Sequence, residues 1–241
     1  MRALIRFSPN THTVPFNHLP KVVGFIHRCI GKDNALHDSV SLYSLGWLQG
    51  GVKRREGLHF PEGAQLTFSS PDSDVLLQLM QGIQEDAHFA FGMVAEATHL
   101  QQAPMVDTGE ARFGVASPVL VRKEVPFAEL PEHIRHKMEA HGEIPETATK
   151  YLTYEDGDEA DALLTQVLHT KLAAAGLPTE GASVAFDRYY LRPRVKLVNY
   201  KGTQSKATVC PVIVSGSAEQ IAFCWNVGVG QCTGISYGSL K

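Results

Sequence analysis

Hydrophobic and polar positions in the first part of the chain alternate first with the period of a strand and then with that of a helix. Within residues 2–8 the side chains of Ala3 and Ile5 fall on one side of an alternating pattern. Pro20 then marks the first turn of a helix over residues 19–30, whose apolar side chains recur every three or four residues. The pattern predicts a half-buried strand followed by an amphipathic helix.

The segments that follow predict the rest of a six-element unit. Short strands are expected at residues 42–48 and 65–69, and a fourth strand at 90–97. Between them a helix is predicted over residues 75–83, with Asp72 in the capping segment before it. The order strand, helix, strand, strand, helix, strand is the split βαβ arrangement of a ferredoxin-like or RRM-like unit.

The second half partly repeats this order. Strands are predicted at residues 110–121, 183–190, 194–200 and 220–225, and an acidic start at 155–158 opens a helix that runs to about Ala175. The predicted fold class is therefore α+β, with two tandem ferredoxin-like (RRM-like) domains. Residues 1–106 form the first domain, and residues 107–241 form the second, which ends in a glycine-rich loop.

Composition narrows the class of protein only slightly. Hydrophobic residues make up 44% of the chain and charged residues 20%, as in ordinary globular proteins. No apolar run approaches the roughly 18 residues that span a bilayer, and the amino terminus has the pattern of a strand instead of a signal peptide. We therefore expect a cytoplasmic protein. The four cysteines form no CxxC pair, so neither a zinc site nor a disulfide framework is expected.

The glycine-rich stretch at residues 228–239 is the most informative motif. Its glycines, which let a backbone turn tightly and approach another backbone or a phosphate, are Gly228, Gly230, Gly234 and Gly238. A dinucleotide-binding loop would need a helix and about 20 further residues after it, and a P-loop would need a Gly-Lys-Ser/Thr sequence. Neither fits. A packed glycine-rich turn and a phosphate-binding loop both remain open.

Several segments, taken in order, resemble the CRISPR repeat-cleaving endoribonucleases of the Cas-six family. The segments with this likeness are residues 25–27, 36–38, 43–45, 113–121, 151–154, 211–216 and 222–239. In that family a strand leads into a terminal glycine-rich loop on the second ferredoxin-like domain. Family loops often carry Lys or Arg between the glycines, whereas this chain has Gln231 and Cys232. The difference directs the expected RNA contacts to other parts of the chain.

The resemblance implies a metal-independent endoribonuclease without a cofactor, which releases guide RNAs from the precursor transcript. The 2′-hydroxyl attacks the adjacent phosphate and leaves 2′,3′-cyclic phosphate and 5′-hydroxyl ends, so a base and an acid are needed, and histidine suits both roles. By the same resemblance His37 is the general base, and His27 orients the phosphate or acts as the acid. Tyr43 and Ser41 position the 2′-hydroxyl or the phosphate. From position alone, all four fit equally well as loop, helix or packing residues.

Two basic regions are candidates for RNA binding, because the net charge of −3 leaves phosphate contacts to local clusters. The first is the run Lys53, Arg54 and Arg55, which also fits a solvated hairpin tip. The second region interleaves tyrosines with Arg188, Arg192, Arg194, Lys196, Lys201 and Lys206. Alternation along a strand would place Arg192, Arg194 and Lys196 on one face, and the tyrosines can stack on bases.

A second hypothesis is a catalytically inactive subunit that holds repeat or guide RNA in a CRISPR effector complex, and a third is a domain pair that binds only protein. The expected partner under the first two hypotheses is CRISPR repeat RNA, single-stranded or hairpin. The sequence leaves open whether the chain joins an effector complex or forms a homodimer.

Overall fold

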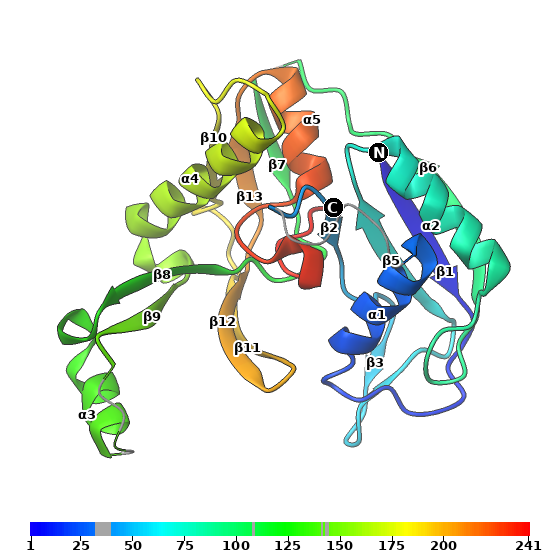
Figure 1. The fold of residues 1–241 in the computed structure, drawn as a ribbon, viewed down its shortest axis with the longest axis horizontal. Coiled ribbons are helices and arrows are strands. Elements are labelled where there is room, and N and C mark those ends of the chain that lie inside the picture. The colour runs from blue at the N-terminus through cyan, green and yellow to red at the C-terminus, as the bar shows by residue number, and fades with distance from the viewer. Residues whose placement is uncertain (32–39, 108, 141, 143–144) are drawn as a thin grey trace.

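The computed structural model describes residues 1–31, 40–107, 109–140, 142 and 145–241. The chain forms two α/β units that lie side by side, the first in blue and cyan and the second in green to red in Figure 1. Each unit has its own large cluster of buried hydrophobic side chains, one between residues 3 and 95 and the other between residues 113 and 240. Within the described ranges, no helix has the length and apolar character that crossing a membrane requires.

The first unit is an antiparallel sheet with two helices packed on one face. Its strands, in the spatial order β2-β5-β1-β6, are β2 (Ser44–Leu45), β5 (Ala64–Ser69), β1 (Arg2–Phe7) and β6 (Ala95–Gln101). The helices are α1 (Leu19–Ile30) and α2 (Ser73–Glu85), and a short ribbon of β3 (Val52–Lys53) and β4 (Leu58–His59) extends from the unit. The order along the chain is that of the ferredoxin-like unit predicted from the sequence, which is confirmed.

Two strands in this unit were predicted with wrong bounds: the strand expected at residues 42–48 covers only Ser44–Leu45, and the fourth strand was placed too early. The fourth strand begins at Ala95 and not at residue 90. The chain turns just before it, where Phe91 and Gly92 have φ angles of 64° and 73°. A left-handed pair of this kind is incompatible with a continuous strand, and the apolar character of Phe89 and Phe91 serves the core instead.

The second unit repeats the arrangement with a reduced fourth strand. Its sheet, in the order β10-β13-β7, consists of β10 (Ser183–Phe186), β13 (Val212–Ser215) and β7 (Glu110–Phe113), with helices α4 (Asp158–Ala174) and α5 (Ala218–Val227). Beyond β7 the chain pairs with the last residues through the antiparallel bridge of Val115 and Leu240. The backbone N–H of Lys241 donates to the carbonyl of Gly114 at 2.8 Å. The carboxyl terminus thus takes the place of the fourth strand.

Two hairpins project from the second unit (Figure 1). The first is formed by β8 (Val121–Pro126) and β9 (Thr147–Leu152), and carries the 3-10 turn η1 (Phe127–Glu129) and helix α3 (Glu132–Ala140) at its tip. The second is formed by β11 (Arg194–Tyr200) and β12 (Thr203–Val209). The remaining 3-10 turns are η2 (Tyr154–Asp156) and η3 (Thr233–Ile235).

The strand predicted at residues 220–225 is wrong, because these residues lie in helix α5. Ser217 and Gln220 form a capping box at its start. The Gln220 N–H donates to Ser217 Oγ at 3.2 Å, and the Ser217 N–H donates to Gln220 Oε1 at 2.8 Å. Most of the helix is buried on every side, from Ile221 to Val227, so the sequence shows no polar face with helical period.

Gly82 is the point at which α2 touches α1. A Cβ added there would lie 1.9 Å from the carbonyl oxygen of Cys29, so we expect Gly82→Ala to lower the free energy of unfolding by about 1–3 kcal/mol. Gly24 in α1 is the matched control, because nothing lies within 4 Å of its added Cβ. There the same change is expected to raise the free energy of unfolding by roughly 0.5–1 kcal/mol. Urea titrations of the two variants check both signs, and equal effects would contradict the packing argument.

Candidate functional site

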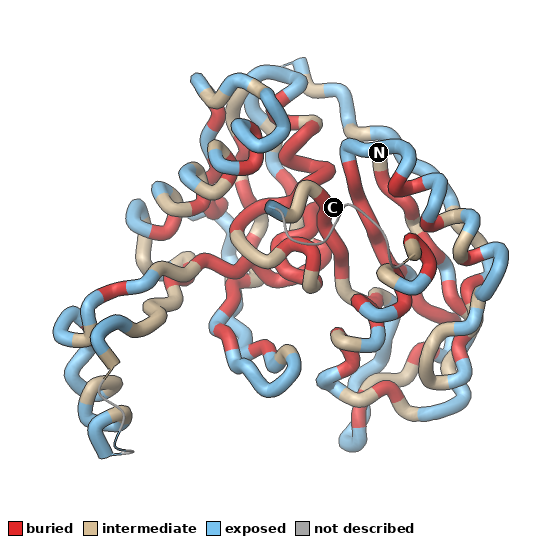
Figure 2. Tube along the Cα trace, in the orientation of Figure 1, coloured by how far each residue is buried: buried red, intermediate tan, exposed pale blue. Residues whose placement is uncertain are grey.

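The glycine-rich loop after α5 lies between the two units and is almost wholly buried, as Figure 2 shows in red near the carboxyl terminus. The loop closes on itself, with the N–H of Val229 donating to the carbonyl of Gly238 at 2.9 Å. A Cβ on Gly238 would lie 1.8 Å from the Val229 oxygen, and one on Gly230 would lie 2.5 Å from the Leu120 oxygen. These glycines are therefore required by close backbone packing. Phosphate binding by Gly228, Gly230, Gly234 and Gly238 stays a prediction.

This loop holds the segment on both sides of β2 of the first unit. The Thr233 hydroxyl donates to the carbonyl of Tyr43 at 2.8 Å, and the Trp47 indole N–H donates to the carbonyl of Ser236 at 2.9 Å. Gly234 lies directly against the tyrosine, because a Cβ there would be 2.6 Å from Tyr43 Oη. The carboxyl-terminal loop thus forms one wall around a tyrosine that belongs to the other unit.

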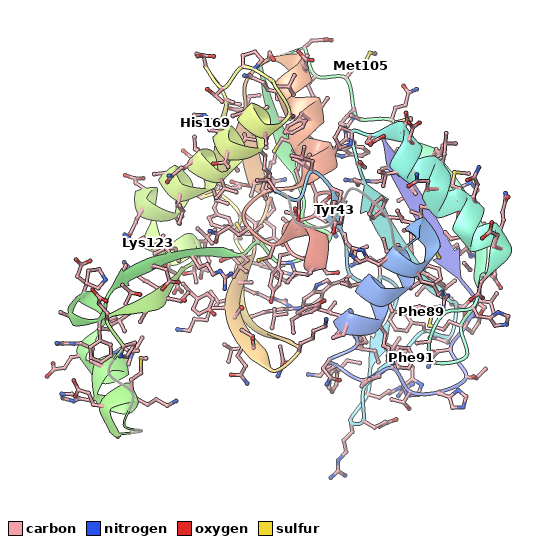
Figure 3. All side chains as sticks on the ribbon, in the orientation of Figure 1. Tyr43, Phe89, Phe91, Met105, Lys123 and His169 are labelled. Carbon is pink, nitrogen blue, oxygen red and sulfur yellow. The ribbon has the colours of Figure 1, made fainter. Side chains whose placement is uncertain are left out.

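Three of the four predicted catalytic residues meet at this wall. His27, near the end of α1, stands edge-on to Tyr43, with ring centroids 6.5 Å apart and an interplanar angle of 79°. Ser41 approaches from the same side as the tyrosine hydroxyl, because the Cβ added at Gly234 would also lie 3.0 Å from Ser41 Oγ. Tyr43 is labelled between the two units in Figure 3.

Burial governs the chemistry that Tyr43 offers. Only 4% of the residue is exposed, and this burial raises the pKa of its hydroxyl, to which nearby Tyr200 adds. The hydroxyl therefore stays protonated at neutral pH and can donate a hydrogen bond.

His37, the predicted general base, lies outside the described residues, as does its neighbour Asp38. The described residues on either side of that segment are Gly31, which follows α1, and Val40. Val40 adjoins Ser41, and Gly31 lies four positions after His27 in the sequence. The role of His37 stays a prediction.

Lys171, to which the sequence analysis gave no role, holds the glycine-rich loop in place through hydrogen bonds. The residue is buried in α4, and its ammonium donates to the carbonyls of Val227 and Gly228 at 3.2 and 3.3 Å and to Thr233 Oγ1 at 3.2 Å. Since Thr233 in turn holds the carbonyl of Tyr43, a chain of hydrogen bonds joins α4 to the site. The sequence signal is a lysine on the apolar stripe of a helix, three positions after Leu168 and next to Leu172.

The predicted basic residues divide into two groups. Lys53, Arg194 and Lys196 form a cluster that spans the two units: the Lys53 ammonium lies 5.6 Å from the ring centroid of Phe16, and that of Lys196 lies 5.1 Å from the ring centroid of Trp47. Partial desolvation lowers the pKa of Lys196, and repulsion from Arg194 and Lys53 lowers it further. Three cations held this close favour binding of an anion.

The other cations predicted to bind RNA are exposed on nearby turns and strand ends. Arg54 and Arg55 lie in the turn between β3 and β4, Arg192 precedes β11, and Lys201 occupies the β11–β12 turn with φ 50°. Arg194 and Lys196 alternate on β11 as predicted, whereas Arg192 lies before the strand. Arg188 forms a salt bridge with the carboxylate of Asp161 and is not part of the cluster.

Comparison of the sequence with models of known families finds no match, and the curated proteins contain no significant match either. Solved structures do match. One described as CRISPR associated protein Cas6 is 17% identical, with a TM-score of 0.76 over 100% of this chain and 98% of its own. A Cas6-related protein from Pyrococcus furiosus is 17% identical (TM-score 0.79; 100% and 97% covered). A RAMP protein described as binding different RNA substrates is 16% identical (TM-score 0.80; 100% and 98% covered).

These matches extend over the full length of the chain and include both units. The molecule therefore has the tandem ferredoxin-like fold of the Cas6 and RAMP proteins. The fold class and the likeness predicted from the sequence are confirmed at the level of the fold. In the part of the chain that the structure describes, no three His, Cys, Asp or Glu side chains gather as a metal-ligand set.

Proposed function

We propose that this chain is a Cas6-family endoribonuclease that cuts CRISPR repeat RNA in the precursor transcript by metal-independent acid–base chemistry. The observation that carries the proposal is the convergence of His27, Ser41 and Tyr43 on one loop within a full-length Cas6 fold. The resemblance to the Cas-six family indicates the same residues for this chemistry. The cytosol, where the transcript is made, is the compartment in which such an enzyme works.

In the proposed reaction His37 takes the proton of the 2′-hydroxyl beside the scissile phosphate. The 2′-oxygen bonds to phosphorus, the bond from phosphorus to the 5′-oxygen breaks, and His27 gives that oxygen its proton. Tyr43 donates a hydrogen bond to a non-bridging oxygen, on which negative charge grows, and Ser41 orients the 2′-hydroxyl. The products carry a 2′,3′-cyclic phosphate and a 5′-hydroxyl.

Phosphate binding in this proposal is carried mainly by Lys53, Arg194 and Lys196. They lie on two units, so one RNA strand that contacts all three bridges the units. Arg54, Arg55, Arg192 and Lys201 extend the positive surface on either side. Because each neutralised phosphate releases counterions, binding is expected to weaken steeply with added salt.

The test is cleavage of the labelled CRISPR repeat from the genome that encodes the chain, in EDTA. A single cut is expected. Its downstream product should accept a phosphate from polynucleotide kinase without prior dephosphorylation, and its upstream product should resist 3′-end ligation until the cyclic phosphate is removed. Cutting that requires an added metal ion would contradict the mechanism, and absence of repeat binding would contradict the function.

The second candidate is an inactive RNA-binding subunit that holds repeat or guide RNA in a CRISPR effector complex. Two observations favour it: the likeness to the RAMP protein described as binding different RNA substrates, and a glycine loop that carries Gln231 and Cys232 instead of cations. Tight repeat binding without any cut would support this candidate over the enzyme. Sedimentation of the chain with and without RNA then distinguishes a monomer from a homodimer.

Gly234→Ala tests the catalytic role of the loop wall. The backbone of Gly234 does not have a positive φ, so alanine can adopt its conformation. The added methyl group would press on Tyr43 Oη and Ser41 Oγ. Because displacement of about 1 Å costs on the order of 100-fold in rate, cleavage should fall by about that factor. Gly24→Ala in α1, where nothing lies within 4 Å of the added Cβ and φ is not positive, is the control for a general effect of alanine. Equal cleavage rates in the two variants would remove Tyr43 and Ser41 from the mechanism.

A further inference from the structure

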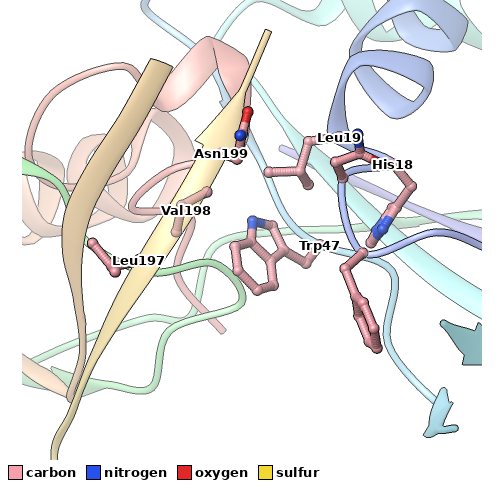
Figure 4. A pocket seen from close by; sticks show the side chains of 8 residues that line it. His18, Leu19, Trp47, Leu197, Val198 and Asn199 are labelled. Atoms are coloured by element: carbon pink, nitrogen blue, oxygen red, sulfur yellow. The ribbon is translucent and has the colours of Figure 1, made fainter. Parts of the chain in front are cut away.

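A small pocket separate from the His27–Tyr43 site lies between the two units. Its volume is about 170 Å³, and it is enclosed by the start of α1, by Trp47 and by strand β11 (Figure 4). Leu19, Trp47, Leu197 and Val198 provide apolar walls, while His18 and Asn199 add polar atoms. Leu197 is 69% exposed, so this wall is open to solvent and accessible to a ligand. A mostly apolar pocket with a few polar groups is the usual setting for a small organic ring.

His18 gives this pocket an unused hydrogen-bond acceptor. The residue is only 4% exposed, and its Nδ1 lies 2.9 Å from the carbonyl oxygen of Pro15. A carbonyl oxygen only accepts, so Nδ1 carries the hydrogen, and burial lowers the pKa and keeps the ring neutral. The lone pair is therefore on Nε2, which has no hydrogen-bond partner among the described residues. Nε2 itself is covered in the free protein, so a ligand that brings an N–H group satisfies it once the neighbouring side chains move aside.

The surroundings of the pocket indicate the class of ligand. The ammonium of Lys196 lies over the Trp47 ring, and that of Lys53 lies over Phe16, which also lines the pocket and is 53% exposed. Arg194 is close enough to repel Lys196. These features match the three parts of a nucleotide. The aromatic wall fits the face of the base, the acceptor fits an N–H on its edge, and the cations fit the phosphate. An apolar peptide side chain would use the apolar walls alone.

We propose that this pocket binds one unstacked nucleobase of the RNA, lying against Trp47 with its base-edge N–H donating to His18 Nε2. The inference rests on the proposed RNA-binding function and adds to it a second contact point apart from the cleavage site. Every standard base carries an N–H donor on its pairing edge, so this hydrogen bond does not distinguish one base from another. A base in a duplex uses that N–H in pairing, so the pocket accepts only an unpaired nucleotide. The separation between this pocket and the cleavage site fixes how many nucleotides lie between the bound base and the scissile phosphate.

The test uses the repeat RNA with the scissile 2′-hydroxyl replaced by hydrogen, and with each nucleotide in turn replaced by an abasic ribose. With the wild-type chain, one position should weaken binding by about tenfold when its base is absent. In Leu197→Ala and in His18→Asn that same abasic RNA should bind as well as the intact RNA, because the base no longer contributes. Asparagine keeps an N–H near the position of Nδ1 for Pro15 and removes the Nε2 acceptor.

Leu77→Ala is the matched control, a leucine that is 54% exposed on α2. Its affinity for RNA should fall by the same factor as that of the wild type when the base at that position is removed. If the abasic effect persists in both pocket variants, or if no position of the scan matters, the pocket does not bind a base, although repeat binding and cutting by the wild type would leave the proposed function intact. Failure of the wild-type chain to bind any repeat RNA would overturn both.

Discussion

Replacing His37 with alanine is expected to slow cleavage of the repeat by about 10²–10⁴-fold, the usual contribution of a general base. Binding should stay near the wild-type level, because the cations assigned to the phosphates, Lys53, Arg194 and Lys196, are unchanged. The measurement is a single-turnover cleavage rate in EDTA, with the dissociation constant from the same titration. Imidazole added to the variant should restore part of the rate, since a diffusible base can then take the proton of the 2′-hydroxyl.

A matched control is His88→Ala, a histidine whose side chain is 82% exposed and pairs with Asp86. It should cut like the wild type. A His37→Ala variant that cuts at the wild-type rate would assign the base to another residue, with His27 the first to test. Loss of binding together with cutting would instead indicate that His37 supports the RNA contacts.

Lys171→Met is expected to lower the free energy of unfolding by about 2–4 kcal/mol, because the lost hydrogen bonds outweigh the relief from burying a charge. The methionine fills the space but leaves the buried oxygens of Val227, Gly228 and Thr233 without their donor. Chemical denaturation measures the loss, and Lys21→Met at an exposed position of α1 is the control, with an expected change within about 0.5 kcal/mol. A loss as small as that of the control would mean that the three hydrogen bonds contribute nothing.

The same lysine makes stability depend on pH in the alkaline range. Burial lowers the pKa of Lys171 from 10.5 to about 8 in the folded state. Below pH 8 the lysine is charged in both states. Between pH 8 and 10.5 the unfolded chain still binds the proton that the folded chain has lost, so the stability of the wild type rises with pH in that window. The difference between wild type and Lys171→Met should therefore grow between pH 8 and 10.5, as denaturation midpoints across that range would show.

Local sequence patterns were sufficient for much of the first unit. Strand β1, helix α1 and the Asp72 cap of α2 were predicted within a few residues, because each has one buried and one exposed face or a clear capping residue. The hairpin with α3 was not predicted. Its helix has no buried residue and its strands have only a few, so the apolar period that marks a packed element is weak there.

The site was predicted only in part, for a reason that concerns distance along the chain. The resemblance to the Cas-six family named His27, Ser41 and Tyr43 as candidates, but the wall that Tyr43 and Ser41 contact comes from Gly234, almost two hundred residues later. The wrong strand at 220–225 has a related cause, since α5 is enclosed by packing from both units and loses its polar face. The capping box of Ser217 and Gln220 is a local signal that identifies this helix.

The bond from Thr233 to the carbonyl of Tyr43 joins residues 190 positions apart, and it has a consequence for the order of folding. Each unit has a core of its own, so most of the buried surface forms through contacts within a unit. Closing so long a loop is slow relative to such contacts. The wall around Tyr43 therefore forms when the two units dock, and catalytic competence should appear after secondary structure and both cores are complete. In a refolding experiment, recovery of activity would lag behind the recovery of circular dichroism.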